Sequence, residues 1–375
     1  MRLIHLSDLH LGKRVNEYSM LPDQRHILNQ ILDIIHQQRP DAVLIAGDIY
    51  DKPVPPAEAV QLFDDFLVQL AQDNIQVFVI SGNHDSPERI AFGGRLMDPS
   101  GIHLSPVFQG TLSPIPLEDP WGTVWFYLLP FLKPAHVRSR LSREDIHTYD
   151  EAIDAVLSQL TLDPTQRHVL VTHQFVTGAN RCDSEELSLG GADNVDAARF
   201  AAFDYVALGH LHGPQCVGRD TVRYCGTPLK YSFSEVHHHK SVTVVDLEEK
   251  GAIHMHTVPL VPLHDLRELR GSFEQLMHPS GGDVEDYLHI TLTDEEDIPD
   301  AIGRLRAIYP NLMVLDYDNT RTRQQTVISG GDVLGEQSPL ELFSAFYEAQ
   351  NNQPMTPQQT AFVQQLMQDI WEETV

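Results

Sequence analysis

The sequence has 375 residues, of which 42% are hydrophobic and 21% are charged, as in an ordinary globular protein, and no apolar run approaches the ~18 residues of a membrane span. The formal charge of −27 argues against strong binding of nucleic acid by this chain alone, because phosphate contacts need Lys and Arg. After residue 250 there are six Arg and twenty Asp and Glu, so about half of the excess negative charge lies in the last third of the chain. A site far from that region can therefore be locally positive. The length predicts one large domain followed by smaller C-terminal pieces.

The first residues of the chain and its cysteines indicate the cellular compartment of the protein. The segment from Met1 to Leu6 is expected to be a strand that runs into a motif. It lacks the basic, apolar and small-residue order of a signal peptide. Three cysteines, Cys182, Cys216 and Cys225, form an odd set without a CxxC pair. Such a set is typical of a reducing compartment, so we expect a cytoplasmic protein without a membrane segment.

Short apolar runs alternate with helical patterns over roughly the first 210 residues. Strands are expected at residues 1–6, 41–46, 75–80, 124–129, 168–172 and 204–208, and helices at 24–38, 56–72 and 148–160. Residues 222–258 alternate polar and apolar side chains, which predicts a closing hairpin or the edge of a second sheet. Strands interleaved with helices predict a layered α/β domain.

The C-terminal part has a different organisation. From about residue 260 we expect a helix, a strand at 287–293, a helix at 299–308 and a strand at 312–317, which together would form a small α+β module. Two final helices are expected to begin at Pro339 and Pro357, because Ser338-Pro-Leu-Glu341 and Thr356-Pro-Gln-Gln359 both match the capping box. The expected domains are therefore residues 1–258, 259–335 and 336–375.

The last helix carries an apolar stripe whose purpose the sequence leaves open. Its members are Phe362, Val363, Leu366, Met367, Ile370 and Trp371. The stripe either packs on its own module or is offered to a partner protein.

Five short motifs each follow a predicted strand. They are Asp8-Leu-His10, Gly47-Asp48-Ile-Tyr-Asp51, Gly82-Asn83-His84-Asp85, the strand-end His173, and Gly209-His210-Leu-His212. In α/β sheets ligands bind at the carboxyl ends of the strands, so the five motifs are expected to converge on one rim.

The residue types in these motifs predict a metal site. Carboxylate, amide oxygen and imidazole suit manganese, iron, zinc or magnesium, and thiolates are absent. On an extended segment, the two ends of a D-x-H or H-x-H motif point to the same face and can both be ligands. Asp48 is central enough to bridge two ions, which could bind a phosphate and stabilise the leaving oxygen. Glycines 47, 82 and 209 are expected to let the backbone turn sharply beside the ions.

Most of the 20 histidines need no functional explanation. The tract His237-His238-His239 could suggest a further metal site, but a solvated turn before the strand at 241 is the better interpretation. The five motifs carry weight because they occur together, in order, at strand ends.

The motif set resembles that of the calcineurin-like binuclear metallophosphoesterases. Ile4 to Gly12, Ser81 to Pro87 and Tyr224 to Ser232 are similar to segments of one branch of this family, the SbcD-type nuclease subunits. The resemblance is good over residues 1 to about 245 and weaker through a capping module and the final helix pair. It implies a layered β-sandwich flanked by helices, with a small α+β capping domain and a C-terminal helix pair.

The resemblance also implies roles for individual residues. One ion would be held by Asp8, His10, Asp48 and His212, and the other by Asp48, Asn83, His173 and His210. His84 would act on the departing oxygen without binding a metal, and Asp85 would orient His84. Manganese is the preferred ion that the family implies, with magnesium, iron and zinc as alternatives. Some relatives carry a His where this chain has Asp51, so no role is transferred to Asp51.

As a function, the resemblance implies an exonuclease and endonuclease that cleaves double-stranded DNA ends and hairpins in repair and recombination. It would act with an SbcC-type coiled-coil ATPase, which agrees with the absence of a GxxxxGK[ST] loop here. It further implies a homodimer within a heterotetramer, for which residues 57–72 and 87–97 are the candidate helices. Two alternatives stay open, namely a phosphoesterase acting on small phosphodiesters or phosphoproteins, and a scaffold protein with an inactive site.

Overall fold

The computed structural model describes residues 1–375 except 181, 183–193, 280, 324–338, 352 and 373–375. It divides into two compact units, Met1–Asp265 and Leu266–Val375. Among the described residues, no helix combines the length and the apolar character needed to cross a membrane.

The first unit contains two six-stranded sheets. The first sheet has the strand order β16 (Ile253–Pro259), β15 (Ser241–Leu247), β1 (Arg2–Leu6), β4 (Ala42–Ala46), β5 (Gln76–Ile80) and β6 (Ile102–Leu104). The second has the order β13 (Gln215–Val217), β14 (Arg219–Tyr224), β12 (Tyr205–Gly209), β9 (Arg167–His173), β8 (Gly122–Leu129) and β7 (Ile115–Asp119). Strands β1, β4, β5 and β6 run parallel, as do β14, β12, β9 and β8, so each sheet gathers several carboxyl ends at one edge.

The two sheets pack face to face around a shared apolar core. Leu3, Leu44 and Phe78 of the first sheet lie in one buried cluster with Phe126 and Val171 of the second. The rings of Phe78 and Phe126 stack at 4.3 Å between centroids. The strand β4, with the sequence AVLIA, fits this position, because a strand covered on both faces reads as a continuous apolar run. In β9, which is also buried throughout, only the central Val169, Leu170 and Val171 are apolar.

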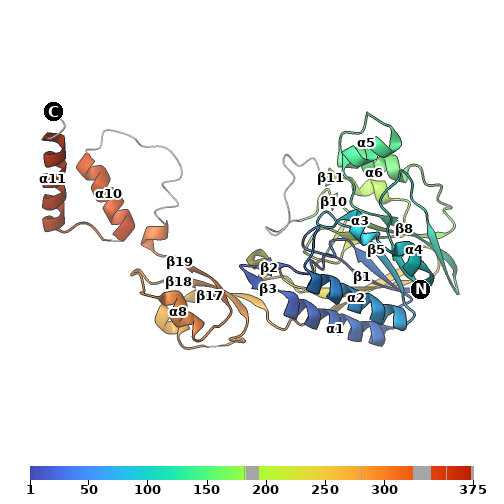
Figure 1. Ribbon diagram of the computed structural model, residues 1–375, viewed down its shortest axis with the longest axis horizontal. Helices are drawn as coiled ribbons and strands as arrows, with labels where there is room; N and C mark the ends of the chain where they lie inside the picture. The colour runs from blue at the N-terminus through green and yellow to red at the C-terminus, as the bar shows by residue number, and fades with distance from the viewer. Residues whose placement is uncertain (181, 183–193, 280, 324–338, 352, 373–375) are drawn as a thin grey trace. The chain divides into compact units, whose positions relative to one another are not determined.

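Helices cover the outer faces of this sandwich (Figure 1). On one side lie α1 (Leu21–Gln38) and α2 (Ala57–Gln72), and on the other lie α5 (Pro134–Leu141) and α6 (Tyr149–Leu157). Each of α1, α2 and α6 turns an apolar stripe inward, as its spacing predicts. The predicted fold class, a layered β-sandwich flanked by helices, is confirmed.

Several short elements complete the first unit. They are β2 (Arg14–Val15), β3 (Tyr18–Ser19), α3 (Pro87–Ile90), α4 (Gly94–Met97), β10 (Phe175–Val176), β11 (Asn194–Val195) and the 3-10 turns η1 (Asp98–Ser100), η2 (Ala197–Phe200) and η3 (Phe233–Glu235).

The second unit begins with a three-stranded parallel sheet, whose order is β17 (Leu266–Gly271), β18 (Tyr287–Leu292) and β19 (Leu312–Tyr317), with helices α7 (Phe273–Leu276) and α8 (Ala301–Arg306). The prediction that a helix comes first after residue 260 was wrong, because β17 precedes α7. An edge strand keeps one side open to water, and the charged side chains of Arg267, Glu268 and Arg270 obscured its strand pattern.

Two helices end the chain, α10 (Pro339–Asn351) and α11 (Pro357–Glu372). The capping box of the second is confirmed, since Gln359 donates its backbone N–H to the Thr356 hydroxyl at 3.3 Å and its side chain accepts from the Thr356 backbone N–H at 2.8 Å. The first predicted capping box depends on Ser338, which lies outside the described residues.

Candidate metal centre

The seven predicted ligands come together at the carboxyl ends of five strands from both sheets. Asp8 and His10 follow β1, Asp48 follows β4, Asn83 follows β5, His173 ends β9, and His210 and His212 follow β12. The predicted rim is therefore the shared edge of two stacked sheets rather than the edge of one.

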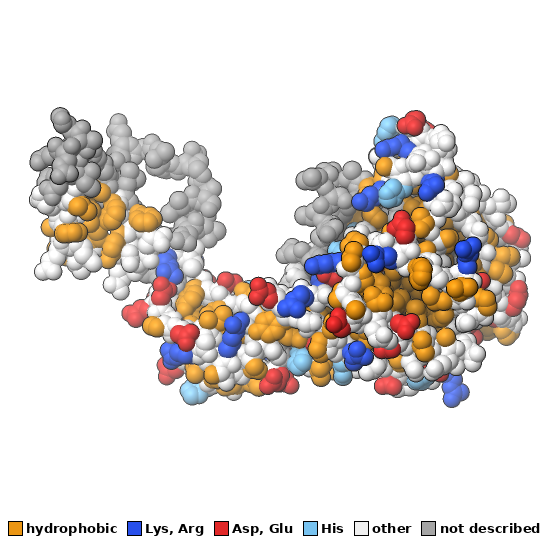
Figure 2. Space-filling model, viewed as in Figure 1, with side chains coloured by type: hydrophobic (Ala, Val, Ile, Leu, Met, Phe, Trp, Pro, Cys, Tyr) orange, Lys and Arg blue, Asp and Glu red, His pale blue; other side chains and the backbone are white. Residues whose placement is uncertain are grey.

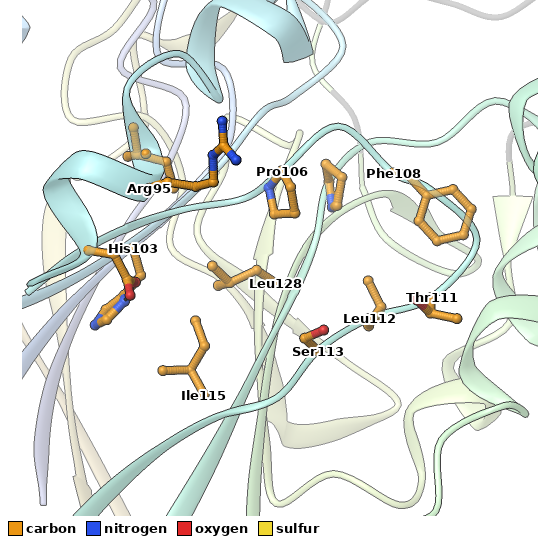
Figure 3. Close-up of a pocket in the computed structure, with 13 residues that line it drawn as sticks. Arg95, His103, Pro106, Phe108, Thr111, Leu112, Ser113, Ile115 and Leu128 are labelled. Atoms are coloured by element: carbon orange, nitrogen blue, oxygen red, sulfur yellow. Dashed lines mark hydrogen bonds and ion pairs between the residues drawn. The ribbon is translucent and has the colours of Figure 1, made fainter.

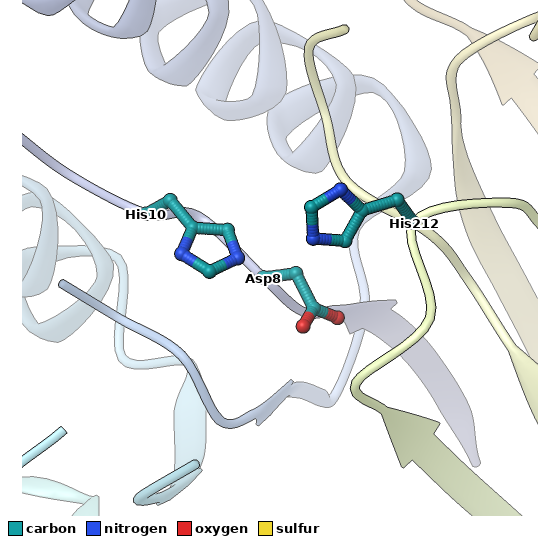
Figure 4. Close-up of side chains that lie close together, drawn as sticks. All are labelled: Asp8, His10 and His212. Carbon is teal, nitrogen blue, oxygen red and sulfur yellow. The ribbon is translucent and has the colours of Figure 1, made fainter. Parts of the chain in front are cut away.

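One group of donors consists of Asp8, His10 and His212. Their ligand atoms all lie within 4.8 Å of one another, and all three residues are buried. The imidazole rings of His10 and His212 are 5.2 Å apart between centroids. Figure 4 shows the two rings and the Asp8 carboxylate converging on a common space.

A second group gathers around Asn83. Its side-chain oxygen lies 2.9 Å from Nε2 of His173 and 3.0 Å from Nδ1 of His210. Asp48 lies between the two groups, because its Oδ2 is 3.4 Å from Nε2 of His173 and 3.8 Å from Nε2 of His10. The arrangement gives two neighbouring sets of donors with one shared carboxylate.

His10 tests whether a metal ion fits this arrangement. The residue is 1% exposed, and neither ring nitrogen has a hydrogen-bond partner among the described residues. Burial lowers the pKa of His10 well below its ordinary value, so the ring is neutral and offers a lone pair. A buried polar atom without a partner is costly, and a divalent ion would satisfy it. The residues present therefore fit a metal.

Without a metal ion, the cluster holds protons that a bound cation would have to displace. Burial acts to raise the pKa of Asp48, but the nearby His173 holds it well below its ordinary value. Burial acts to lower the pKa of His173, and the Asp48 carboxylate raises it to about 9. Burial raises the pKa of Asp8 to about 6. A metal ion would compete with a proton at such a histidine, because imidazole binds metals only when neutral.

The backbone of the ligand segments adopts an uncommon conformation. Asp8, His10, Asp48 and His210 have φ of 52°, 44°, 49° and 103°, in the left-handed region that L-residues rarely occupy. The prediction that Asp8 and His10 share a face of an extended segment was therefore wrong. Instead the segment turns, and its N–H groups at Asp8 and His10 donate to the carbonyls of Gly47 and Asp48 at 3.0 and 2.9 Å. Strained residues of this kind cluster at functional sites.

The three glycines beside the ligands serve two purposes. Gly47 has φ +88° and makes the sharp turn that we predicted. The other two are outside the positive-φ set and are needed for space instead. A Cβ at Gly82 would collide with the Asp48 carboxylate, and one at Gly209 would collide with the carbonyl oxygen of Ala46 and lie 2.7 Å from Nδ1 of His173.

Replacing Gly209 by alanine is expected to lower both stability and metal affinity. The added methyl would push against a backbone carbonyl that cannot move aside, at a cost of about 1–3 kcal/mol or more. It would also displace the His173 ring, so manganese binding measured by titration should weaken. Gly94→Ala is the matched control, since that glycine also lacks a positive φ and its added Cβ would come no closer than 3.3 Å to the Leu104 side chain. Equal metal affinity in the two variants would contradict the explanation.

His84 and Asp85 lie beside the ligands but are held differently from each other. Nδ1 of His84 is 3.1 Å from the carbonyl oxygen of Asp51, and its Nε2 is 4.0 Å from Oδ2 of Asp48. The Asp85 carboxylate, which we expected to orient His84, instead accepts backbone N–H groups from Gly82, Ile49 and Tyr50 at 2.9–3.1 Å. Burial, helped by Asp48, raises the pKa of Asp85 to about 7. Asp85 thus ties together the two loops that carry Asp48 and Asn83.

The Asp51 side chain faces a lysine. Its Oδ1 is 2.7 Å from Nζ of Lys13, and only its backbone carbonyl contacts His84.

Two polar residues that the sequence interpretation missed hold the Leu9–His10 backbone. The Gln24 side chain on α1 donates to the carbonyl oxygen of His10 at 2.7 Å, and the Tyr231 hydroxyl donates to that of Leu9 at 2.6 Å. Gln24 is 1% exposed and lies on the apolar face of its helix, three residues before Ile27. A polar residue at an apolar-face position was the available signal.

Two other features lie outside this centre. His237 and His239 are exposed in a turn before β15, as predicted for the histidine tract. A cavity of about 360 Å³ is lined mainly by apolar residues of the α4–β6 region and β8, with Arg95 and His103 beside it (Figure 3). It contains none of the seven ligands.

Two family models match the chain. Residues 1–214 match the calcineurin-like phosphoesterase family, and residues 262–351 match the family described as type 5 capsule protein repressor C-terminal domain. The first match covers more than half of the chain and includes all seven ligands.

Curated relatives match along the whole chain. The SbcD component of the nuclease SbcCD from Staphylococcus epidermidis is 31% identical, with 99% of each chain covered. The protein of the same name from Staphylococcus saprophyticus is 29% identical and covers 100% of this chain and 99% of its own. Among solved structures, a dimetal phosphatase from Danio rerio is 13% identical with a TM-score of 0.41, and covers 70% of this chain and 98% of that one.

Proposed function

Because the chain belongs to the calcineurin-like phosphoesterase family, and within it to the family of the SbcD components of SbcCD nucleases, we propose that it is a metal-dependent nuclease. The observation that carries the proposal is the clustered set of seven donors. It includes the buried His10 ring, whose nitrogens have no hydrogen-bond partner among the described residues. In a scaffold that binds no metal, a buried imidazole that lacks hydrogen bonds would cost stability without return. The intact donor set favours an enzyme.

Two divalent ions would be held by the seven ligands. Asp8, His10, Asp48 and His212 would hold one, and Asp48, Asn83, His173 and His210 the other. Oxygen and imidazole donors suit manganese, which we propose as the working ion, and also magnesium, iron or zinc. Bound at this site, such ions supply Lewis acidity to the phosphate and lower the pKa of water.

His84 is proposed to act on the oxygen that leaves the phosphate. The Asp51 carbonyl can only accept a hydrogen bond, so Nδ1 of His84 carries the hydrogen in that contact. Nε2 is then the atom that can hold a proton near the departing oxygen and give it up. Asp85 keeps the loops in place through backbone amides rather than through the His84 ring.

Duplex DNA is the proposed substrate, cleaved at ends and hairpins during repair and recombination. The support for DNA is membership of a family whose relatives are named nucleases. The charge of −27 makes strong binding of DNA by this chain alone unfavourable, so a partner is proposed to supply basic surface.

The proposal of a DNA substrate is tested by comparing cleavage of two substrates in the presence of manganese. We expect the chain with its ATPase partner to cleave linear duplex DNA as well as a small aryl phosphodiester. Cleavage of the aryl phosphodiester alone would favour the alternative of a small-molecule phosphoesterase. Cleavage of neither would favour the scaffold.

The C-terminal helices are proposed as the docking site for an SbcC-type coiled-coil ATPase. Apolar side chains gather on the described part of α10 and α11 (Figure 2). Phe346 is 61% and Phe362 is 68% exposed, and Phe343 and Leu366 are also exposed. Such a patch is costly in water unless a partner covers it. Leu340 and Tyr347 belong to the same proposed faces, whereas the side chains of Ile370 and Trp371 lie outside the described residues.

Truncation after residue 335 is expected to abolish co-purification with the ATPase while leaving the metal centre intact. The nuclease unit keeps its own core, so hydrolysis of the aryl phosphodiester should persist. A double variant, Phe346→Ser with Phe362→Ser, should reproduce the loss in the full chain. Retention of the partner by both variants would remove the proposed docking site.

The remaining assignments are proposals as well. Residues 1–258 would form the nuclease domain, 259–335 the capping domain, and 336–375 the partner-binding helices. We further propose a cytoplasmic protein that forms a homodimer within a heterotetramer. The exposed Phe92 and Leu96, at 82% and 85%, lie in the 87–97 segment proposed for the dimer. Size-exclusion chromatography with light scattering measures the oligomeric state of the chain.

A further inference from the structure

A buried acidic side chain stands behind one of the proposed ligands. Glu235, in η3, is 0% exposed, and its Oε1 lies 3.0 Å from Nδ1 of His212. No motif in the sequence singled it out. Nδ1 of His212 therefore faces a carboxylate. The same residue belongs to the donor group in which ligand atoms of Asp8, His10 and His212 lie within 4.8 Å of one another.

A lysine closes this contact from the other side. Nζ of Lys240 donates to Oε2 of Glu235 at 2.6 Å, to the Thr227 hydroxyl at 2.6 Å and to the backbone carbonyl oxygen of His212 at 3.0 Å. Lys240 is itself only 7% exposed. The same ion pair thus contacts both the ring and the backbone of His212.

We propose that Glu235 and Lys240 are positioning residues that prepare His212 to bind its metal ion. The inference rests on the proposed metal centre. A carboxylate can only accept a hydrogen bond, so the hydrogen of the neutral ring is on Nδ1 and the lone pair is on Nε2. Carboxylate partners of this kind fix the tautomer and orientation of metal-binding histidines.

Lys240 makes the arrangement possible at this depth. A lone buried carboxylate is unfavourable, and the lysine supplies both the opposite charge and a hydrogen bond. The lysine holds the backbone carbonyl of His212 and Glu235 holds its ring, so the ion pair fixes both the main chain and the side chain of the residue.

Glu235→Gln is the direct test, made in the full chain and measured by manganese titration. The glutamine has the same shape but can present its NH₂ group to Nδ1, which would move the ring hydrogen to Nε2 and block the lone pair. We expect the affinity of one of the two bound ions to fall about 10–100-fold and that of the other to change little. Asp119→Asn is the matched control. Asp119, at the end of β7, forms an ion pair at 2.9 Å with the buried Arg167 and has no contact with the seven proposed ligands among the contacts of the described residues.

The double variant Glu235→Gln with Lys240→Met separates positioning from a purely structural ion pair. Removing both charges is expected to recover part of the melting temperature that either single change lowers, because no charge is left buried and unpaired. Recovery is partial because Thr227 and the His212 carbonyl lose their hydrogen bonds to the lysine. The weakened manganese affinity should remain, since His212 still lacks its carboxylate.

The outcomes can be told apart from failure of the nuclease assignment, because metal binding is measured without DNA. Affinity that is unchanged in Glu235→Gln, or restored in the double variant, would overturn the positioning role while leaving the nuclease proposal untouched. A wild-type chain that binds fewer than two ions would overturn both. A wild-type chain that binds two ions but cleaves no DNA would count against the substrate alone.

Discussion

Replacing Asp48 by asparagine is expected to remove bound manganese and to lower phosphodiester hydrolysis by about 1,000-fold or more. The Asp48 carboxylate reaches into both donor groups, at 3.4 Å to His173 and 3.8 Å to His10. The amide keeps the shape but loses the charge that balances these histidines. The affinity for both ions should therefore fall, whereas a change in a ligand that belongs to only one ion should weaken that ion alone.

Metal content after dialysis and the rate on an aryl phosphodiester measure the two effects. Asp33→Asn, at an exposed position on α1, is the control and should behave as wild type. In the native chain Asp48 also accepts the His84 backbone N–H at 2.9 Å, so circular dichroism should confirm that the variant folds. A folded variant that keeps two ions would contradict the bridging position.

His84→Gln is expected to separate catalysis from metal binding. His84 is not one of the seven proposed ligands, although it lies in a group with His10 and Asp48 that could hold a metal, and its Nδ1 contacts the Asp51 carbonyl. Loss of a positioned proton donor typically costs about 10²–10⁴-fold in rate. The variant should therefore bind two manganese ions and cleave duplex DNA at least about 100-fold more slowly.

The matched control is His237→Gln, at an exposed turn position. Wild-type rates in His84→Gln would remove the proposed role on the departing oxygen. Loss of metal in that variant would instead make His84 a ligand.

The sequence predicted that the proposed ligands lie close together, because each motif directly follows a recognisable strand. Parallel neighbours such as β1 and β4 place their carboxyl ends together, so Asp8 and Asp48 meet without any knowledge of side-chain geometry. The same reasoning found the strands β1, β4, β5, β8, β9 and β12 and the helices α1, α2 and α6 to within a few residues, but it missed β6, β7 and α5.

The conformation of the ligand loops could not be predicted in this way. The left-handed φ angles of Asp8 and His10 depend on hydrogen bonds to Gly47 and Asp48, residues far along the chain. The family resemblance gave Asp85 the role of orienting His84, whereas its carboxylate accepts the backbone N–H groups of Gly82 and Ile49. Gln24 contacts the His10 backbone and Glu235 contacts the His212 ring, and neither residue belongs to a motif that contains its partner. The motifs therefore could not predict these contacts.

The number of divalent ions bound to the folded wild-type chain tests the central claim most directly. Manganese titration of the full chain, with metal content counted after removal of loosely bound ions, should give two ions per chain. One ion, or none, bound to a chain whose folding is confirmed by circular dichroism would contradict a centre in which seven ligands share Asp48 between two metals.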